Sequence, residues 1–324
     1  MATIDLFDTG YFYADGGAMF GAIPKTAWFR KYPSDESNAC ILAMRSLLIT
    51  TEDHRRILVD TGAGFKHLQR LNYYRFFGLH NLTDELSVRN LQPEDITDVV
   101  LTHLHFDHCG FCTQEEGGKM KMTFPNARYW VSERQWHNLQ HPNALEKESY
   151  FKEDMQAVEE AGQLQLLFED LVLTPDVTLR LFDGHTAGQI VPYIRTANET
   201  VVFAGDVIPL FASISPEWIS AYDIAPLTSY EEKCRLLEQA VQEQQRIVFC
   251  HDAYTQAACI KKTESGLYLP IRESIQKPLS KSRKTDILTK IASSGQEKKR
   301  DSVHFSPYFG LFLENSDQNK AKKS

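Results

Sequence analysis

Four residues that commonly bind metal ions lie within six positions, in the order His103, His105, Asp107 and His108. Such a density of imidazoles and carboxylate is unusual for residues that serve only packing. Neutral imidazole nitrogens and a carboxylate oxygen suit a borderline cation such as Zn²⁺, at ligand distances of about 2.0–2.2 Å. In an extended segment His103 and His105 point the same way and can chelate one ion, while Asp107 and His108 face an adjacent position.

Three further candidate ligands each follow an expected strand: His185 in Gly-His-Thr, Asp206 in Gly-Asp-Val and His251 in Cys-His-Asp. Each of them alone would also fit a surface, turn or capping position. Together the seven residues supply ligands for two divalent ions, of which Zn²⁺ is expected, with Mn²⁺, Fe²⁺ or Co²⁺ as alternatives. Two cations about 3.5–4 Å apart share a water and lower its pKa from about 15.7 toward 7, so hydroxide becomes available as a nucleophile. The residues therefore predict a metal-dependent hydrolase.

The expected secondary structure places these residues at the ends of strands. Residues 98–102 predict a buried strand that runs into the histidine motif, and residues 246–250 predict a strand that ends at His251. Residues 229–242 predict an amphipathic helix that begins with a capping box. The other expected strands are residues 40–49, 56–60, 128–131, 177–182, 190–195 and 200–204, and the other expected helices are residues 83–91, 132–139 and 150–161.

Length and charge suggest one large domain with a separate tail. The chain has 324 residues, 42% of them hydrophobic, and a formal net charge of −8. Residues 277–324 contain 11 basic and 5 acidic residues, or +6, so residues 1–276 carry −14. We therefore expect a catalytic domain at residues 1–276 and a basic, flexible C-terminal tail at residues 277–324. The acidic charge of the larger part argues against nucleic-acid binding and favours a neutral or apolar small substrate.

The N-terminal residues show neither a basic region nor an apolar core of a secretory signal. No run of about 18 apolar residues is present that could span a membrane. The six cysteines are sparse for a chain of this length, which favours free thiols in a reducing compartment. Cys109 and Cys112 form a C-x-x-C pair, but Cys109 directly follows His108, so we interpret both as small buried thiols. The cytoplasm is the expected location.

The order of these motifs resembles the metallo-β-lactamase superfamily. The resemblance rests on Thr-His-Leu-His-Phe-Asp-His-Cys-Gly at residues 102–110, Gly-His-Thr-Ala-Gly at 184–188, Gly205-Asp206, His251-Asp252 and the upstream Asp-Thr-Gly at 60–62. It covers residues 1–265 and leaves the tail outside. It implies an α/β fold, an αββα sandwich of two mixed β-sheets flanked by helices, with the site at one edge between the sheets.

The resemblance also implies a role for each residue. His103, His105 and His185 would hold the first metal, Asp107, His108 and His251 the second, and Asp206 would bridge both. Asp60 would accept a hydrogen bond from a ligand histidine and fix its tautomer, although a simple turn-capping role is the alternative. Asp107 would also carry a proton to the leaving group. A homodimer is a further expectation from the resemblance.

Three segments are similar to the branch that contains N-acyl-homoserine lactone lactonases and methyl parathion hydrolases: residues 15–25, 205–209 and 221–223. The similarity implies opening of a lactone or cleavage of a related ester. Phosphotriester hydrolysis is the alternative in chemistry, and a mononuclear iron oxidoreductase of the persulfide dioxygenase type is the alternative in class.

Substrate contacts are expected from two parts of these segments. Met19, Phe20 and Trp28 would form an apolar substrate wall, unless they are ordinary core residues. Several lactonases have a tyrosine three residues after the bridging aspartate, where this chain has Pro209. Tyr222 is the expected substitute, with a hydroxyl that donates to a developing oxyanion, and a hydrogen bond to a backbone carbonyl is the alternative.

Overall fold

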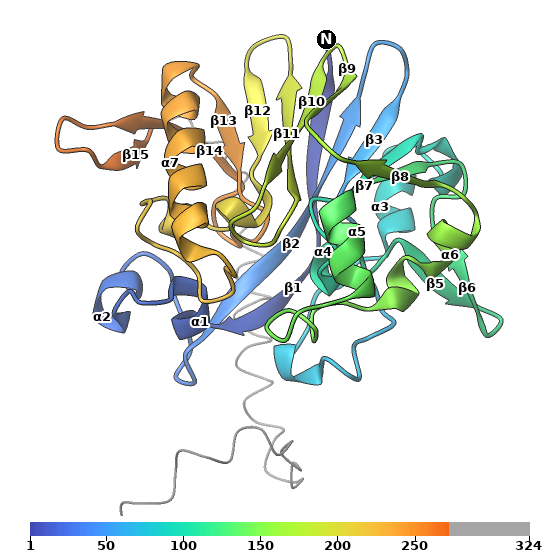
Figure 1. Ribbon diagram of the computed structural model, residues 1–324, viewed down its shortest axis with the longest axis horizontal. Coiled ribbons are helices and arrows are strands. Elements are labelled where there is room, and N and C mark those ends of the chain that lie inside the picture. The colour runs from blue at the N-terminus through green and yellow to red at the C-terminus, as the bar shows by residue number, and fades with distance from the viewer. Residues whose placement is uncertain (272–324) are drawn as a thin grey trace, which may run out of the picture. The chain divides into compact units, whose positions relative to one another are not determined.

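Two mixed β-sheets pack face to face, and helices cover the outer face of each (Figure 1). The computed structural model describes residues 1–271, so the basic tail predicted at residues 277–324 lies outside the described residues. The layers run helix, sheet, sheet, helix. The predicted αββα sandwich is confirmed.

The first sheet has the strand order β1-β2-β3-β4-β7-β8. Its first three strands pair antiparallel, while β3, β4, β7 and β8 run parallel to one another. The carboxyl ends of parallel strands meet at one edge, which is where ligands bind in open α/β sheets. The strands are β1 (Thr3–Asp15), β2 (Ala39–Thr50), β3 (Arg56–Val59), β4 (Asp98–Val100), β7 (Arg128–Ser132) and β8 (Leu164–Leu167).

The second sheet has the strand order β15-β14-β13-β12-β11-β10-β9. Only β12 and β13 pair parallel, so their carboxyl ends also lie side by side. The strands are β9 (Leu171–Thr174), β10 (Val177–Phe182), β11 (Gln189–Arg195), β12 (Thr200–Phe203), β13 (Arg246–Val248), β14 (Ala257–Lys262) and β15 (Tyr268–Pro270). A separate small hairpin contains β5 (Thr113–Glu116) and β6 (Lys119–Met122).

The longest described helix, α7 (Pro226–Gln242), covers the second sheet and begins three residues before the predicted Ser229. Proline at its first position explains the earlier start, because its fixed φ suits a helix and its missing N–H needs no partner there. The other α-helices are α1 (Gly16–Phe20), α2 (Lys25–Trp28), α3 (Leu82–Ser87), α4 (Phe106–Cys109), α5 (Glu133–Gln140) and α6 (Gln156–Glu160). The 3₁₀ segments are η1 (Asn72–Tyr74), η2 (Pro93–Asp95), η3 (Lys152–Asp154), η4 (Gly205–Val207) and η5 (Phe211–Ser213).

Aliphatic side chains from both sheets fill the space between them. Val59 and Val100 of the first sheet share one cluster with Val201 and Val248 of the second, and none is more than 1% exposed. Full burial of a side chain of this size contributes about 1.5–3 kcal/mol. The short parallel strands, buried on both faces, thus fix the edge from which the candidate ligands project.

Several elements differ from the prediction, and β5, β6, β8, β9, β14 and β15 were not predicted. β1 (Thr3–Asp15) was not predicted, because polar residues and Gly10 interrupt its alternation; the pairing with β2 shifts register between Asp8 and Gly10. The helix expected at residues 150–161 is divided into η3 and α6.

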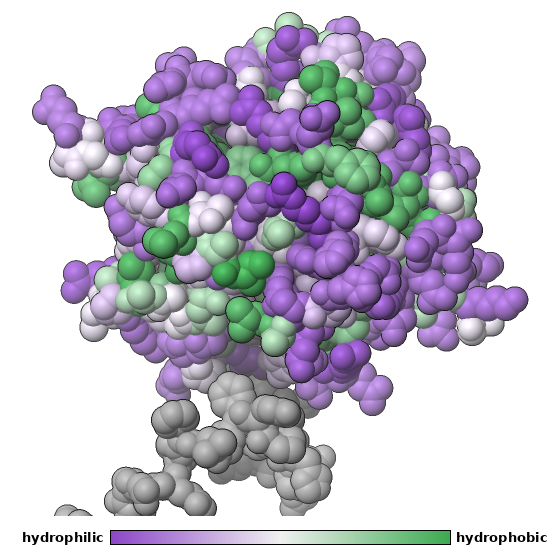
Figure 2. Space-filling model, in the orientation of Figure 1, coloured by the Kyte–Doolittle hydropathy of each residue, from purple (hydrophilic) through white to green (hydrophobic). Residues whose placement is uncertain are grey.

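Hydrophilic side chains predominate on the face shown in Figure 2, with apolar ones among them. In the part of the chain that the structure describes, no helix is both long enough and apolar enough to cross a membrane.

Candidate metal centre

All seven predicted metal ligands follow the ends of strands, on loops or short helical turns. The motif from His103 to His108 follows β4 and runs into α4, which His105 precedes. His185 follows β10, Asp206 lies in η4 after β12, and His251 follows β13. Segments up to 148 residues apart in sequence therefore meet at one edge of the two sheets.

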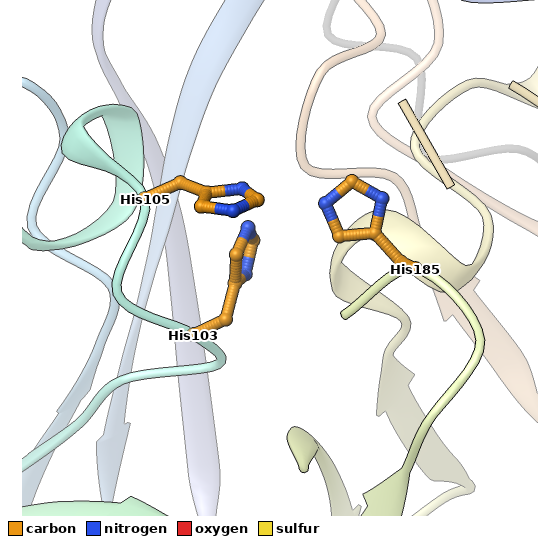
Figure 3. A group of neighbouring side chains, drawn as sticks. All are labelled: His103, His105 and His185. Atoms are coloured by element: carbon orange, nitrogen blue, oxygen red, sulfur yellow. The ribbon is translucent and has the colours of Figure 1, made fainter. Parts of the chain in front are cut away.

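Three of the histidines form a first group, and their rings point toward one another (Figure 3). The ring centroids of His103 and His105 lie 4.5 Å apart, and that of His185 lies 5.0 Å from the first and 5.3 Å from the second. One ring nitrogen of each lies within 4.8 Å of those of the other two, so the group could hold one metal ion.

Asp107, His108 and His251 form a second group with the same property. Nε2 of His251 lies 3.2 Å from Nε2 of His108 and 3.5 Å from Oδ2 of Asp107. The ring centroids of His103 and His108 are only 4.0 Å apart, so the two groups adjoin. Two other sets with the same property overlap these groups: His103, His108 and Asp206, and Asp206, Cys250 and His251. The assignment of each ligand to one of two ions therefore stays a prediction.

Asp206 lies between the groups and turns one carboxylate oxygen to each. Its Oδ1 is 3.1 Å from Nε2 of His251 and 3.4 Å from Nε2 of His108. Its Oδ2 is 3.5 Å from Nε2 of His185. A carboxylate with this orientation could bridge two cations.

In each of the five histidines, one ring nitrogen contacts a protein group, so the other ring nitrogen is available to bind a metal ion. Nδ1 of His108 contacts Asp60, Nδ1 of His185 contacts Asp223, and Nε2 of His105 contacts Glu146, at 2.8, 2.9 and 3.3 Å. Nδ1 of His251 donates to the carbonyl of Ala43 at 2.8 Å, and Nδ1 of His103 lies 3.1 Å from the hydroxyl of Thr102. Outer partners of this kind orient metal-binding imidazoles and raise their basicity.

Two of the inward nitrogens have no hydrogen-bond partner among the described residues. They are Nε2 of His103 and Nε2 of His185, and both are buried. Because a buried polar atom without a partner is costly, two such atoms in one cluster of ligand atoms fit a site for a cation. Burial lowers the pKa of His103, which favours the neutral imidazole that a metal ion needs. The residues present therefore fit a metal pair.

Asp60 connects the two parallel strands beneath the centre. Its carboxylate accepts hydrogen bonds from the backbone N–H and the hydroxyl of Thr102, at 2.8 and 2.9 Å, as well as from His108. Its backbone φ is +56°, an uncommon conformation for a residue with a side chain. Asp60 thus has the contact with a candidate ligand that the sequence analysis expected.

Two other supporting carboxylates had no role predicted from the sequence. Glu146, which is 3% exposed, contacts His105 and also accepts a hydrogen bond from the hydroxyl of Tyr150 at 3.1 Å. Asp223 contacts His185 from a loop 38 residues further along the chain. No local motif marks Glu146, and Asp223 lies in the segment 221–223 that resembles the lactonase branch, but its contact with His185 arises only through the fold.

Gly184 fixes His185 by close approach to α7. A Cβ atom at this position would lie 2.4 Å from the backbone Cα of Ser229 and 2.5 Å from its backbone nitrogen. Only glycine permits this contact. The Gly-His pair of the sequence therefore reflects packing of the β10 end against the start of α7.

A pocket opens onto the two groups of candidate ligands. Its polar wall includes His105, Asp107, His185, Asp206 and His251. The rest of its wall is largely apolar or aromatic, and comes chiefly from Phe12, Ala14, Met19, Leu42, Tyr74, Phe106, Leu145, Pro209 and Ile224. No lysine or arginine lines this pocket among the described residues 1–271.

The predicted substrate wall needs a correction. Met19 lines the pocket, but Phe20 and Trp28 do not. They are 0% and 1% exposed and stack on each other with ring centroids 5.0 Å apart, so they support the wall from behind. The sequence alone does not show which of these apolar residues line the pocket and which are packed behind its wall.

Tyr222 lines the pocket and remains 41% exposed. Within residues 1–271 no hydrogen bond to a backbone carbonyl is found for its hydroxyl, unlike the alternative that the sequence left open. Burial raises its pKa to about 12, so the hydroxyl stays protonated near neutral pH and can donate.

The cysteines near the centre are free and buried. Cys109 contacts the carbonyl of Leu104 and Cys112 contacts the hydroxyl of Thr61, in agreement with small structural thiols. Cys250 adds a contact that the sequence did not predict, since its thiol lies 3.1 Å from Oδ1 of Asp206.

Known proteins resemble this chain in sequence and in structure. A model of the metallo-beta-lactamase superfamily matches residues 45–112. A probable metal-dependent hydrolase from Staphylococcus aureus is 28% identical with a TM-score of 0.75, over 85% of this chain and 98% of that one.

Two more distant structures share the fold. AidC, a dizinc quorum-quenching lactonase solved with N-hexanoyl-L-homoserine as product, is 20% identical with a TM-score of 0.69, over 85% of this chain and 96% of that one. The hydrolase AbOPH is 22% identical with a TM-score of 0.66 over the same shares. A search of curated protein sequences finds no match.

Proposed function

The chain belongs to the metallo-β-lactamase superfamily, and on this premise we propose that it is a metal-dependent hydrolase that opens a lactone or cleaves a related neutral ester. The observation that carries the proposal is a single pocket that joins the two groups of candidate ligands to a largely apolar wall without a lysine or arginine in the described residues.

We assign the metal ligands as the two groups suggest. His103, His105 and His185 would hold one divalent ion, with Asp107, His108 and His251 holding the other and Asp206 reaching both. Zinc is the metal that these nitrogen and oxygen donors suit, and the dizinc lactonase AidC has the same fold. When bound, such a pair supplies an activated water and polarises the bond to be cleaved.

The pocket wall supports an uncharged substrate. Recognition of a carboxylate or phosphate group ordinarily uses lysine or arginine, and none lines this pocket in the described chain. Phe12, Tyr74 and Phe106 instead offer apolar surface for an acyl chain or aryl group. AidC and a second N-acyl homoserine lactone hydrolase, 21% identical to this chain, were both solved with N-hexanoyl-L-homoserine bound.

The chain's own residues would carry the remaining steps. Asp107 lines the pocket within 3.5 Å of His251 and can pass a proton to the departing oxygen. Tyr222 can donate a hydrogen bond to the carbonyl oxygen as negative charge develops on it. Asp60 and Asp223 hold the tautomers of His108 and His185.

The test is hydrolysis by metal-loaded protein of three neutral substrates: N-hexanoyl-homoserine lactone, a phosphotriester and an aryl ester. Preferential opening of the lactone, lost in Asp206→Ala, supports the proposal. A phosphotriester is also neutral and therefore also fits a pocket without lysine or arginine. Preference for it would make phosphotriesters, in place of lactones, the proposed substrate class. Two metal ions per chain are expected, and a single iron with no hydrolysis would favour the dioxygenase alternative.

A further inference from the structure

Glu146 brings a negative charge into the pocket wall outside the group of assigned metal ligands. It is 3% exposed and lines the pocket with Leu145 and Ser149. Its carboxylate accepts hydrogen bonds from the hydroxyl of Tyr150 and the side-chain amide of Asn143, and both partners are neutral. The charge therefore remains at the wall.

No cationic residue neutralises Glu146 in the described part of the chain. Its ion-pair partner within residues 1–271 is His105, at 3.3 Å. As an assigned metal ligand, this histidine is the neutral imidazole that a metal ion needs. Asp223, the other supporting carboxylate in the wall, differs because it interacts electrostatically with the buried amine of Lys233.

Four carboxylates line the pocket, and Glu146 differs from the other three. Asp107 and Asp206 are assigned metal ligands, and Asp223 lies near the amine of Lys233. Glu146 is not an assigned metal ligand, and within residues 1–271 it forms no ion pair with a lysine or arginine. In a pocket with reduced access to water, its charge is screened less than at the surface.

Hydrolysis itself makes the charge of Glu146 relevant. Water adds to the acyl carbon of a neutral ester or lactone, the bond from acyl carbon to oxygen breaks, and the products are a carboxylate, a hydroxyl group and one released proton. The negative charge of Glu146 thus repels the carboxylate, which is absent from the substrate and present in the product.

We propose that Glu146 is a specificity-determining residue that excludes substrates with an anionic group beside the scissile bond and weakens binding of the carboxylate product. The inference rests on the proposed function for its substrate class. It does not require Glu146 to touch the reacting atoms.

The primary test is equilibrium binding of hexanoate, measured by calorimetry on metal-loaded protein, with hexanamide as the neutral probe of similar shape. In Glu146→Gln the glutamine oxygen can still accept from His105 while the charge is gone. We expect hexanoate to bind about tenfold more tightly to this variant than to the wild type, with hexanamide changed by less than about twofold; tenfold corresponds to about 1.4 kcal/mol. Equal affinity of both proteins for hexanoate would overturn the proposal.

Glu148→Gln is the matched control. It removes the same charge two residues away, where the side chain is 70% exposed and near Arg70 and Lys147. It should bind hexanoate as the wild type does. Metal content is measured for all three proteins, so that a loss of metal cannot pass for a change in specificity.

A second measurement needs no variant. The wild type is compared on an aryl butyrate and on the corresponding aryl succinate monoester, which carries a carboxylate. We expect kcat/KM to be at least about tenfold higher for the neutral ester, and equal values would overturn the proposal. Hexanoate binding requires no turnover, so it still tests Glu146 if the substrate panel shows no hydrolysis and the proposed function fails.

Discussion

Nδ1 of His108 donates a hydrogen bond to Oδ2 of Asp60 at 2.8 Å, and both side chains are almost fully buried. The contact joins the end of β3 to the motif that follows β4. It fixes the tautomer in which Nε2 of His108 faces Asp206 and His251. Asp60 therefore determines how one candidate ligand of the second group is presented to a metal ion.

The first prediction is that Asp60→Asn weakens metal binding at the second group by about 10–100-fold. Asparagine tolerates the positive φ of residue 60, so the substitution changes the charge and leaves the backbone conformation accessible. Affinity is measured by competition with a chromophoric chelator, and metal content by elemental analysis.

Asp84→Asn is the control for this prediction, because Asp84 is exposed in the first turn of α3 and is neither a candidate ligand nor assigned as a partner of one. It should bind two metal ions with the affinity of the wild type. If Asp60→Asn did the same, Asp60 would be only a turn residue, as the alternative from the sequence has it.

The second prediction concerns pH in the metal-free protein. Burial lowers the pKa of His251, but the carboxylates of Asp206 and Asp107 outweigh this effect and raise it to about 9. The unfolded value is about 6.5, so between about pH 6.5 and 9 the folded chain holds a proton that the unfolded chain has released. The stabilisation is complete below about pH 6.5 and is lost as the pH rises through about 9. We expect the free energy of unfolding, measured with urea, to fall by about 1–3 kcal/mol across this window.

Metal loading should reverse that dependence. A divalent ion takes the place of the proton on His251, so metal affinity should rise over the same range of pH. His251→Gln cannot bind the proton and should show a flatter stability curve when metal-free. A free energy of unfolding that is constant or rises from about pH 6.5 to 9 in the metal-free wild type would contradict the assigned shift.

The sequence predicted the elements and residues whose signals are local. The runs at residues 98–102 and 246–250 are short, apolar and β-branched, and they correspond to β4 and β13 with the histidines directly after them. The spacing from His103 to His108 identified candidate ligands because few other roles require so many imidazoles together. These features depend on neighbours in the sequence.

What the sequence missed depends on tertiary contacts. Glu146 meets His105 from 41 residues away, and the short segment around it has an ordinary polar composition. Met19 and Phe20 are adjacent apolar residues, yet one lines the pocket and the other is buried behind it. Which side of a layer a residue occupies follows from the packing of α1 against β1, and no local pattern encodes it.

The last prediction concerns the hydroxyl of Tyr222. If it donates to the carbonyl oxygen only as charge develops there, Tyr222→Phe lowers kcat and leaves KM nearly unchanged. We expect a loss of about tenfold, less than the roughly 10²–10³ found for fully buried oxyanion donors, because Tyr222 is 41% exposed. Since its pKa is raised to about 12, the loss should be the same at every pH from about 6 to 9.

Tyr254→Phe is the matched control, because Tyr254 is 44% exposed and does not line the pocket. A rise in KM with kcat unchanged would instead make Tyr222 a binding residue, and unchanged kinetics would remove it from the mechanism and leave Asp107 and the metal ligands to act without it.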